Sequence, residues 1–203
     1  MNWHLYSAFL AITLVLVLTP GPIVTLVIAT GASQGARAGL VTVAGTSAGT
    51  AVLLAIIAAG LGWVLKNAAP LFELLRWVGA AYLIWLGVTA WRKASAAALA
   101  PPRHRALFRR GFVVALSNPK TIAFFTAFLP QFIDPTLPVA RQLLMLCASS
   151  VLLAAFTDSG WAIASGLGRA WLVKPAQAKL LGRISGAALI GGGLWLSLVR
   201  RPS

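Results

Sequence analysis

The sequence predicts an all-α integral membrane protein with six transmembrane helices, arranged as two inverted three-helix repeats. Hydrophobic residues make up 59% of the 203 residues and the mean hydropathy is +0.87, which is well outside the composition of soluble domains. Six apolar stretches are near the length of about 20 residues that a helix needs to cross the hydrocarbon. Short motifs also recur at corresponding places in the two halves, which predicts the internal repeat.

The spans are justified in order by these apolar stretches. They lie at about residues 5–30, 39–63, 69–91, 111–133, 142–167 and 182–199. Only short loops remain between them, so the chain is expected to form one transmembrane domain, 1–203. The first span is interpreted as a retained helix and not as a signal peptide, because the segment before it, MNWHLYSAF, contains no Lys or Arg.

The basic residues indicate the orientation. The net charge is +14, but the Lys and Arg residues lie between apolar runs and not on a soluble face, so no nucleic-acid partner is expected. Cytoplasmic loops carry the excess of Lys and Arg. The basic loops 92–110 and 169–183 are therefore predicted to be cytoplasmic, with both termini outside. Contact of these loops with anionic membrane lipids is also expected.

Two pairs of motifs define the repeat. RWVGAA in the third span matches RISGAA in the sixth, and PGP (20–22) in the first span corresponds to NPK (118–120) in the fourth. An odd number of helices per copy makes the copies enter the membrane in opposite directions, which is typical of secondary transporters. Chance similarity among small residues that pack helices is the alternative. The two copies cover about residues 1–93 and 104–203.

Glycines recur at a spacing of four residues. Gly31, Gly35 and Gly39 form one such series, and Gly45 and Gly49 form another. Small residues at this spacing let helices pack backbone against backbone. We interpret both series as packing surfaces, with a hinge at 31–39 as the alternative.

Prolines are predicted to break the first and fourth helices near the membrane midplane, at TPGPI (19–23) and SNPKT (117–121). Such a break frees backbone carbonyls that hydrocarbon cannot satisfy. Pro22 suits the first turn of a new half-helix, and Gly21 would let the backbone approach a ligand. The half-helix beginning near Ile23 would direct free N–H groups at an anion. A single proline can also be a simple kink, but two equivalent breaks favour a binding site.

Lys120 and Asp158 are the two charged residues deep in the predicted spans. Burial of either costs at least about 2.5 to 3.5 kcal/mol on insertion scales, so each is a functional candidate. The alternatives are a helix–helix hydrogen bond or mutual neutralisation, and for Lys120 a side chain that reaches toward the cytoplasm. Deep His residues and paired carboxylates are absent from the sequence, so we expect no enzyme activity and no metal site.

PGPIVTLVIATGASQGARAGLVTVAGTSAG (20–49) and NPKTIAFFTAFLPQFID (118–134) resemble the two hallmark segments of the lysine exporter (LysE/RhtB) family of amino-acid exporters. The resemblance extends over the whole chain. It implies a bacterial inner-membrane secondary transporter that exports amino acids or their derivatives, with a proton as the coupling ion and no other cofactor. Many members have a polar residue after PGP, whereas this chain has Ile23, which leaves room for a more apolar substrate. The candidate substrate-binding residues are Pro20, Gly21, Pro22, Ile23, Asn118, Pro119, Lys120 and Asp158.

The expected site and an amino-acid zwitterion complement each other. The half-helix end at Ile23, together with Lys120, would bind the carboxylate, and Asp158 would bind the ammonium group and also carry the exchanged proton. Rocking of the two repeats would give alternating access. A non-transporting membrane scaffold or subunit and a passive channel are the alternatives. Substrate, stoichiometry and a homo-oligomeric state are left open.

Overall fold

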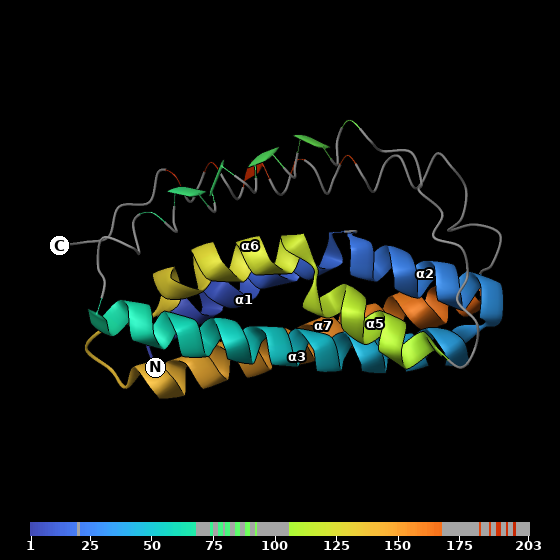
Figure 1. The fold of residues 1–203 in the computed structure, drawn as a ribbon, viewed down its shortest axis with the longest axis horizontal. Helices are drawn as coiled ribbons and strands as arrows, with labels where there is room; N and C mark the ends of the chain where they lie inside the picture. Colours follow the sequence, from blue (N-terminus) through green and yellow to red (C-terminus); the bar gives the residue numbers. More distant parts are fainter. Residues whose placement is uncertain are drawn as a thin grey trace.

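The computed structural model describes residues 1–19, 21–67 and 106–167, together with scattered positions between 74 and 92 and between 183 and 197. The described part is built of helices (Figure 1). The predicted spans 69–91 and 182–199, with the RWVGAA and RISGAA motifs, lie mostly outside the described residues. In chain order the helices are α1 (Trp3–Leu18), α2 (Pro22–Gln34), α3 (Ala36–Asn67), α5 (Leu107–Leu116), α6 (Pro119–Phe128), the short 3₁₀ helix η2 (Leu129–Phe132) and α7 (Val139–Leu167).

Two helices and two bent pairs in the described residues are long and apolar enough to cross a membrane. The continuous ones are α7 and the Ala36–Leu61 part of α3. The bent pairs are α1 with α2, at 49°, and α5 with the segment from α6 through η2, at 42°. The bends confirm the predicted breaks in the first and fourth helices. Six spans, an inverted repeat and a midplane position of the breaks stay predictions.

The helices pack around the two long ones. α3 packs against α5 and α7, α2 packs against both α3 and α7, and α1 packs against α7. In Figure 1, α1 and α6 lie on one side of the breaks, and α2 and α5 lie on the other. The two breaks therefore meet in the middle of the described bundle, where the chain changes direction twice.

Glycines allow the backbones on the α2 and α5 side to come close. A Cβ added at Gly39 would lie 2.9 Å from Ala162 Cβ, and one added at Gly45 would overlap the Phe108 carbonyl group. Real Cβ atoms do not approach other atoms so closely. The interpretation of the glycine series as packing surfaces is confirmed at these contacts. Gly35 differs, because it joins α2 to α3 with φ 93°, a conformation that favours glycine.

Aromatic rings fill the core on the α1 and α6 side. Phe9 of α1 packs edge to face against Phe125 of α6 and Phe132 of η2, with ring centroids 6.4 Å and 5.3 Å apart. The buried Gln142 closes this end of the bundle, because its amide donates to the Asp134 and Leu137 carbonyls and accepts from the Asp134 N–H. The loop between η2 and α7 is thereby fixed to α7.

Helix α5 begins four residues before the predicted start of the fourth span at 111, so the last residues of the basic loop 92–110 are helical; the cytoplasmic location of this loop stays a prediction. The structure places Arg109 and Arg110 in the first turn of α5, which begins at Leu107. Basic residues are unfavourable near a helix N-terminus, and Ala106 supplies no side-chain cap, so the sequence carries no helix-start signal there. Packing decides the start, since Leu107 is buried and the Phe108 backbone lies against Gly45.

Candidate functional site

The second half of the first broken helix begins without a side-chain cap. Gly21 is the N-cap of α2 and Pro22 is its first residue, as predicted. Thr25 N–H donates to the Gly21 carbonyl at 2.9 Å, so the N–H groups of Ile23 and Val24 precede the first intrahelical bond. Groups at this position have no acceptor within their own helix. The start of α2 therefore presents two N–H donors and the positive end of a helix dipole.

The corresponding start of α6 is closed by its own cap. Asn118 Oδ1 accepts from the Lys120 N–H at 3.1 Å, and Asn118 Nδ2 donates to Thr121 Oγ1 at 2.8 Å. Pro119 is the first residue of α6, at the same position that Pro22 has in α2. Both ends of the Asn118 amide are engaged, so Asn118 shapes the break and Pro119 sets the direction of α6.

Lys120 joins the two broken helices. Its ammonium group donates to the Leu16 carbonyl at 2.6 Å and to the Thr19 carbonyl at the end of α1. The side chain is 9% exposed, so it lies in the interior of the bundle. These bonds satisfy carbonyls that the break at Thr19 removes from the helix. One of the three ammonium N–H groups remains for another acceptor.

Gly21 leaves room for the lysine beside it. Its backbone, with φ −145° and ψ −167°, is extended, so the conformation does not require glycine. A Cβ at this position would lie 3.2 Å from Lys120 Cδ and 3.6 Å from Lys120 Nζ. In this structure the group beside the Gly21 backbone is the Lys120 side chain, and the approach of a ligand to Gly21 stays a prediction.

Asp158 is a buried carboxylate that has no direct partner among the described residues. It lies on α7 and is 5% exposed. Within the described residues it makes no hydrogen bond and no ion pair, although the charge of Lys120 attracts it. Burial of a polar group costs free energy unless the group is hydrogen-bonded. This carboxylate is therefore available to a cationic ligand.

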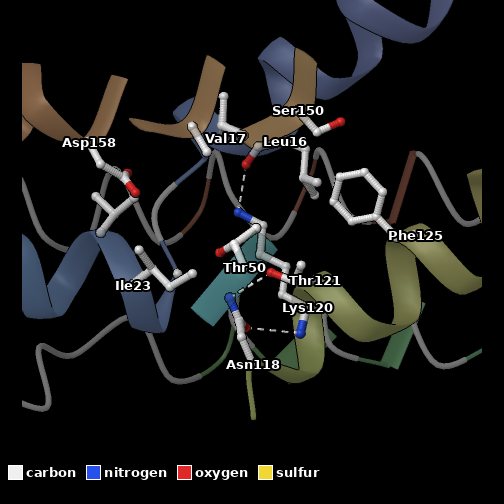
Figure 2. A pocket seen from close by; sticks show the side chains of 13 residues that line it. Leu16, Val17, Ile23, Thr50, Asn118, Lys120, Thr121, Phe125, Ser150 and Asp158 are labelled. Carbon is white, nitrogen blue, oxygen red and sulfur yellow. Dashed lines mark hydrogen bonds between the residues drawn. The ribbon is translucent and has the colours of Figure 1, made fainter. Parts of the chain in front are cut away.

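One cavity of about 50 Å³ brings these residues together. Gly21, Ile23, Asn118, Lys120 and Asp158 line it, as Figure 2 shows for the labelled side chains. Its volume has room for bound water but is well below the several hundred Å³ typical of ligand pockets. Pro22 and Pro119 form the adjoining helix starts and do not line the cavity. Pro20 lies outside the described residues.

Four polar or aromatic lining residues were not predicted: Thr50, Thr121, Phe125 and Ser150. Thr50 is 6% exposed, and its hydroxyl has no hydrogen-bond partner in the described part of the chain. Thr46 and Thr42, one and two turns earlier on α3, donate instead to carbonyls of their own helix. The spacing of these threonines by four residues was the one sequence signal for Thr50.

The cavity is elongated along α7. Ser150, Ala154 and Asp158 recur every four residues on one face of this helix, and the rise of the helix separates Ser150 from Asp158 by about 12 Å. Figure 2 shows Asp158 at the opposite end of the cavity from Phe125. The described residues contain no cluster of His, Cys, Asp or Glu that could hold a metal ion.

Comparison with known proteins gives the family. Residues 14–199 match the model of the LysE type translocator family. The chain is 33% identical over 204 residues to homoserine/homoserine lactone efflux proteins of Salmonella typhimurium and Salmonella typhi, with 98% of this chain and 99% of each relative covered. It is also 33% identical over 205 residues to an uncharacterised membrane protein of Vibrio cholerae, covering 98% of this chain and 100% of that protein. No solved structure matches it. The chain therefore belongs to the LysE type translocator family, whose members are transporters and not enzymes.

Proposed function

We propose that this chain is a secondary transporter that exports homoserine or a similarly small amino acid across the bacterial inner membrane in exchange for protons. The family and the names of the Salmonella relatives support export of such a substrate. The observation that carries the proposal is the unpaired, buried Asp158 in a cavity that also contains the uncapped start of α2. These two features offer opposite charges to a zwitterion.

The carboxylate of the substrate binds at the start of α2. The N–H groups of Ile23 and Val24 donate to it, and the remaining N–H of Lys120 lies beside the same break. The ammonium group of the substrate binds Asp158, which otherwise has no partner within the described residues. Ile23 contributes an apolar wall next to the donors, so it limits the polarity of the substrate near its α-carbon.

Transport requires the cavity to enlarge. A volume of about 50 Å³ is too small for an amino acid, so the described conformation is a closed one. The two bends, of 49° and 42°, are the places where half-helices can move relative to each other. Alternating access follows if the two halves of the chain rock around the fixed cavity. Proton binding by Asp158 displaces the substrate ammonium and resets the site.

The orientation proposed for the chain follows its basic residues. The loops around 92–105 and 169–183 face the cytoplasm and contact anionic lipids, with both termini outside. The Asp134 loop between η2 and α7 then lies on the outer side. In this orientation the substrate enters from the side of α2 and α5 and leaves from the side of α1 and α6.

Amino-acid pools test the proposal. Cells that express the chain are loaded with homoserine, and its intracellular and extracellular concentrations are followed over time. We expect lower intracellular and higher extracellular homoserine than in cells that express Asp158→Asn at the same membrane level. A scaffold would leave both pools unchanged, and a passive channel would equalise them without export against a gradient. Either result would contradict the proposal.

A further inference from the structure

The end of α1 forms a cation site that is already filled by the chain itself. The Lys120 ammonium group donates to both the Leu16 and the Thr19 carbonyl, and Figure 2 shows the bond to Leu16. In broken-helix transporters the carbonyl ends of half-helices commonly bind the coupling Na⁺ or proton. The Lys120 ammonium group therefore occupies the position at which such proteins bind a free cation.

The charge at this place is held mainly by backbone oxygens. Lys120 makes no ion pair within the described residues. Asp158 of α7 is the other titratable group among the residues that line the cavity, and its charge attracts Lys120 without direct contact. The lining residues from α1, α2 and α3 are apolar or hydroxyl-bearing. The Lys120 ammonium group is therefore stabilised by the negative end of the α1 dipole and by the Leu16 and Thr19 carbonyls.

The bonds from Lys120 to the Leu16 and Thr19 carbonyls are not those of an ordinary helix cap. Lys120 lies 104 residues after Leu16 and 101 after Thr19, so it bonds to the other predicted half of the chain. The equivalent position in the first half, the residue after Pro22, is Ile23, which has no charge. The two breaks therefore share a proline at the first position of the new helix, but they differ in the cap residue, Gly21 or Asn118, and in the residue after the proline, Ile23 or Lys120. Among the described residues, a side-chain cation binds at the break where α1 ends, and none is found at the break where α5 ends.

We propose that Lys120 is a resident cation, which fills a cation site at the end of α1 and so makes transport independent of Na⁺. It also connects α1 to α6 across the two breaks, and Gly21 leaves the room for its side chain. This inference rests on the proposed transport function, because the role of the cation is to hold the site in a form that binds substrate.

The test removes the lysine and supplies other cations. Lys120→Ala and the wild-type protein are reconstituted in liposomes loaded with homoserine, in Na⁺, ethylammonium or N-methylglucamine salts of equal ionic strength. Wild-type efflux is expected to be the same in all three salts. For Lys120→Ala we expect a loss of at least about tenfold in N-methylglucamine, as charge-assisted hydrogen bonds would give, with recovery in ethylammonium or Na⁺. Wild-type efflux by Lys120→Ala in every salt would overturn the proposal, and so would a loss that neither cation restores.

Transport by Lys120→Gln and thermal unfolding of Lys120→Ala test the role of the charge separately. Lys120→Gln retains N–H donors without the charge, so we expect this variant to fold and to transport homoserine poorly in every salt. Normal transport by Lys120→Gln would show that Lys120 acts only as a neutral hydrogen-bond donor and would refute the proposal. Thermal unfolding of Lys120→Ala in detergent should shift upward with Na⁺ or ethylammonium, while that of the wild type should not. If the wild type moves no homoserine but this shift is present, the proposed function fails and the cation site stands. If the wild type transports and the shift is absent, the cation site fails alone.

Discussion

Replacing Asp158 with Asn separates its role in binding from any role in folding. The substitution keeps the shape of the side chain and removes its charge. Within the described residues Asp158 has no hydrogen bond and no ion pair to lose, and it is 5% exposed. Insertion of a carboxylate into a membrane helix costs about 2.5 kcal/mol or more. The variant is therefore expected to unfold at the same temperature as the wild type or at a higher one.

Asp158→Asn should weaken substrate binding, although it should not lower stability. A hydrogen bond to a charged group contributes about 1.5 to 3 kcal/mol, and every 1.4 kcal/mol is about tenfold in affinity. We expect Asp158→Asn to bind homoserine about 10 to 150 times more weakly. Binding is measured by calorimetry on the purified protein, and unfolding by circular dichroism on the same samples.

Asp134 supplies the matched control. It is the partly buried aspartate of the loop after η2 and lies outside the cavity, so Asp134→Asn should bind homoserine as the wild type does. Unchanged affinity in Asp158→Asn would refute the assignment of the ammonium site. A large loss of stability in that variant would show that the carboxylate has a structural partner, which the structure does not provide in its described part.

Three further predictions concern the fold around the site. Gly45→Ala places a Cβ against the Phe108 backbone, whereas Gly60→Ala on the same helix meets nothing within 4 Å. Gly45→Ala should therefore lower the free energy of unfolding by about 1 to 3 kcal/mol, and Gly60→Ala should not. Equal melting temperatures of the two variants would contradict this packing. Asn118→Ala removes the cap of α6 and should cost about 1 kcal/mol, seen in urea or thermal unfolding, while retention of full stability would mean that the cap is dispensable. Hydrogen bonds from Thr136 hold the pKa of Asp134 below its usual value. The loop is therefore stabilised at neutral pH and loses this contribution as the pH falls through that lowered pKa. The protection of its amides against hydrogen exchange, taken relative to the intrinsic rate at each pH, should therefore fall in acid. Asp134→Asn should remove this pH dependence of the protection, and an unchanged pH response would contradict it.

The helices and their breaks were predictable from the sequence because they follow local rules. Apolar length marks the long helices, and proline cannot continue a helix without losing a hydrogen bond. Pro22 and Pro119 both begin new half-helices, as their fixed φ favours. The start of α5 was missed, because the contact between Gly45 and the Phe108 backbone decides it and no local signal marks it.

The contents of the site were predictable only in part. Lys120 and Asp158 stand out as charges in apolar segments, and both line the cavity. The partners of Lys120 are backbone carbonyls more than 100 residues away, which no spacing in the sequence indicates. Thr50 was missed for a similar reason, since a threonine in a helix usually bonds to its own backbone and only the fold shows that this one does not.

Proton-driven export by the purified protein tests the central claim most directly. Liposomes that contain the protein and a pH indicator hold equal homoserine inside and outside, and a pH gradient, acidic on the side that receives homoserine, is then imposed. We predict that homoserine accumulates on the acidic side while protons move the opposite way, and that Asp158→Asn abolishes both fluxes. Homoserine that stays equal on the two sides, or proton flux that continues without homoserine, would contradict the account.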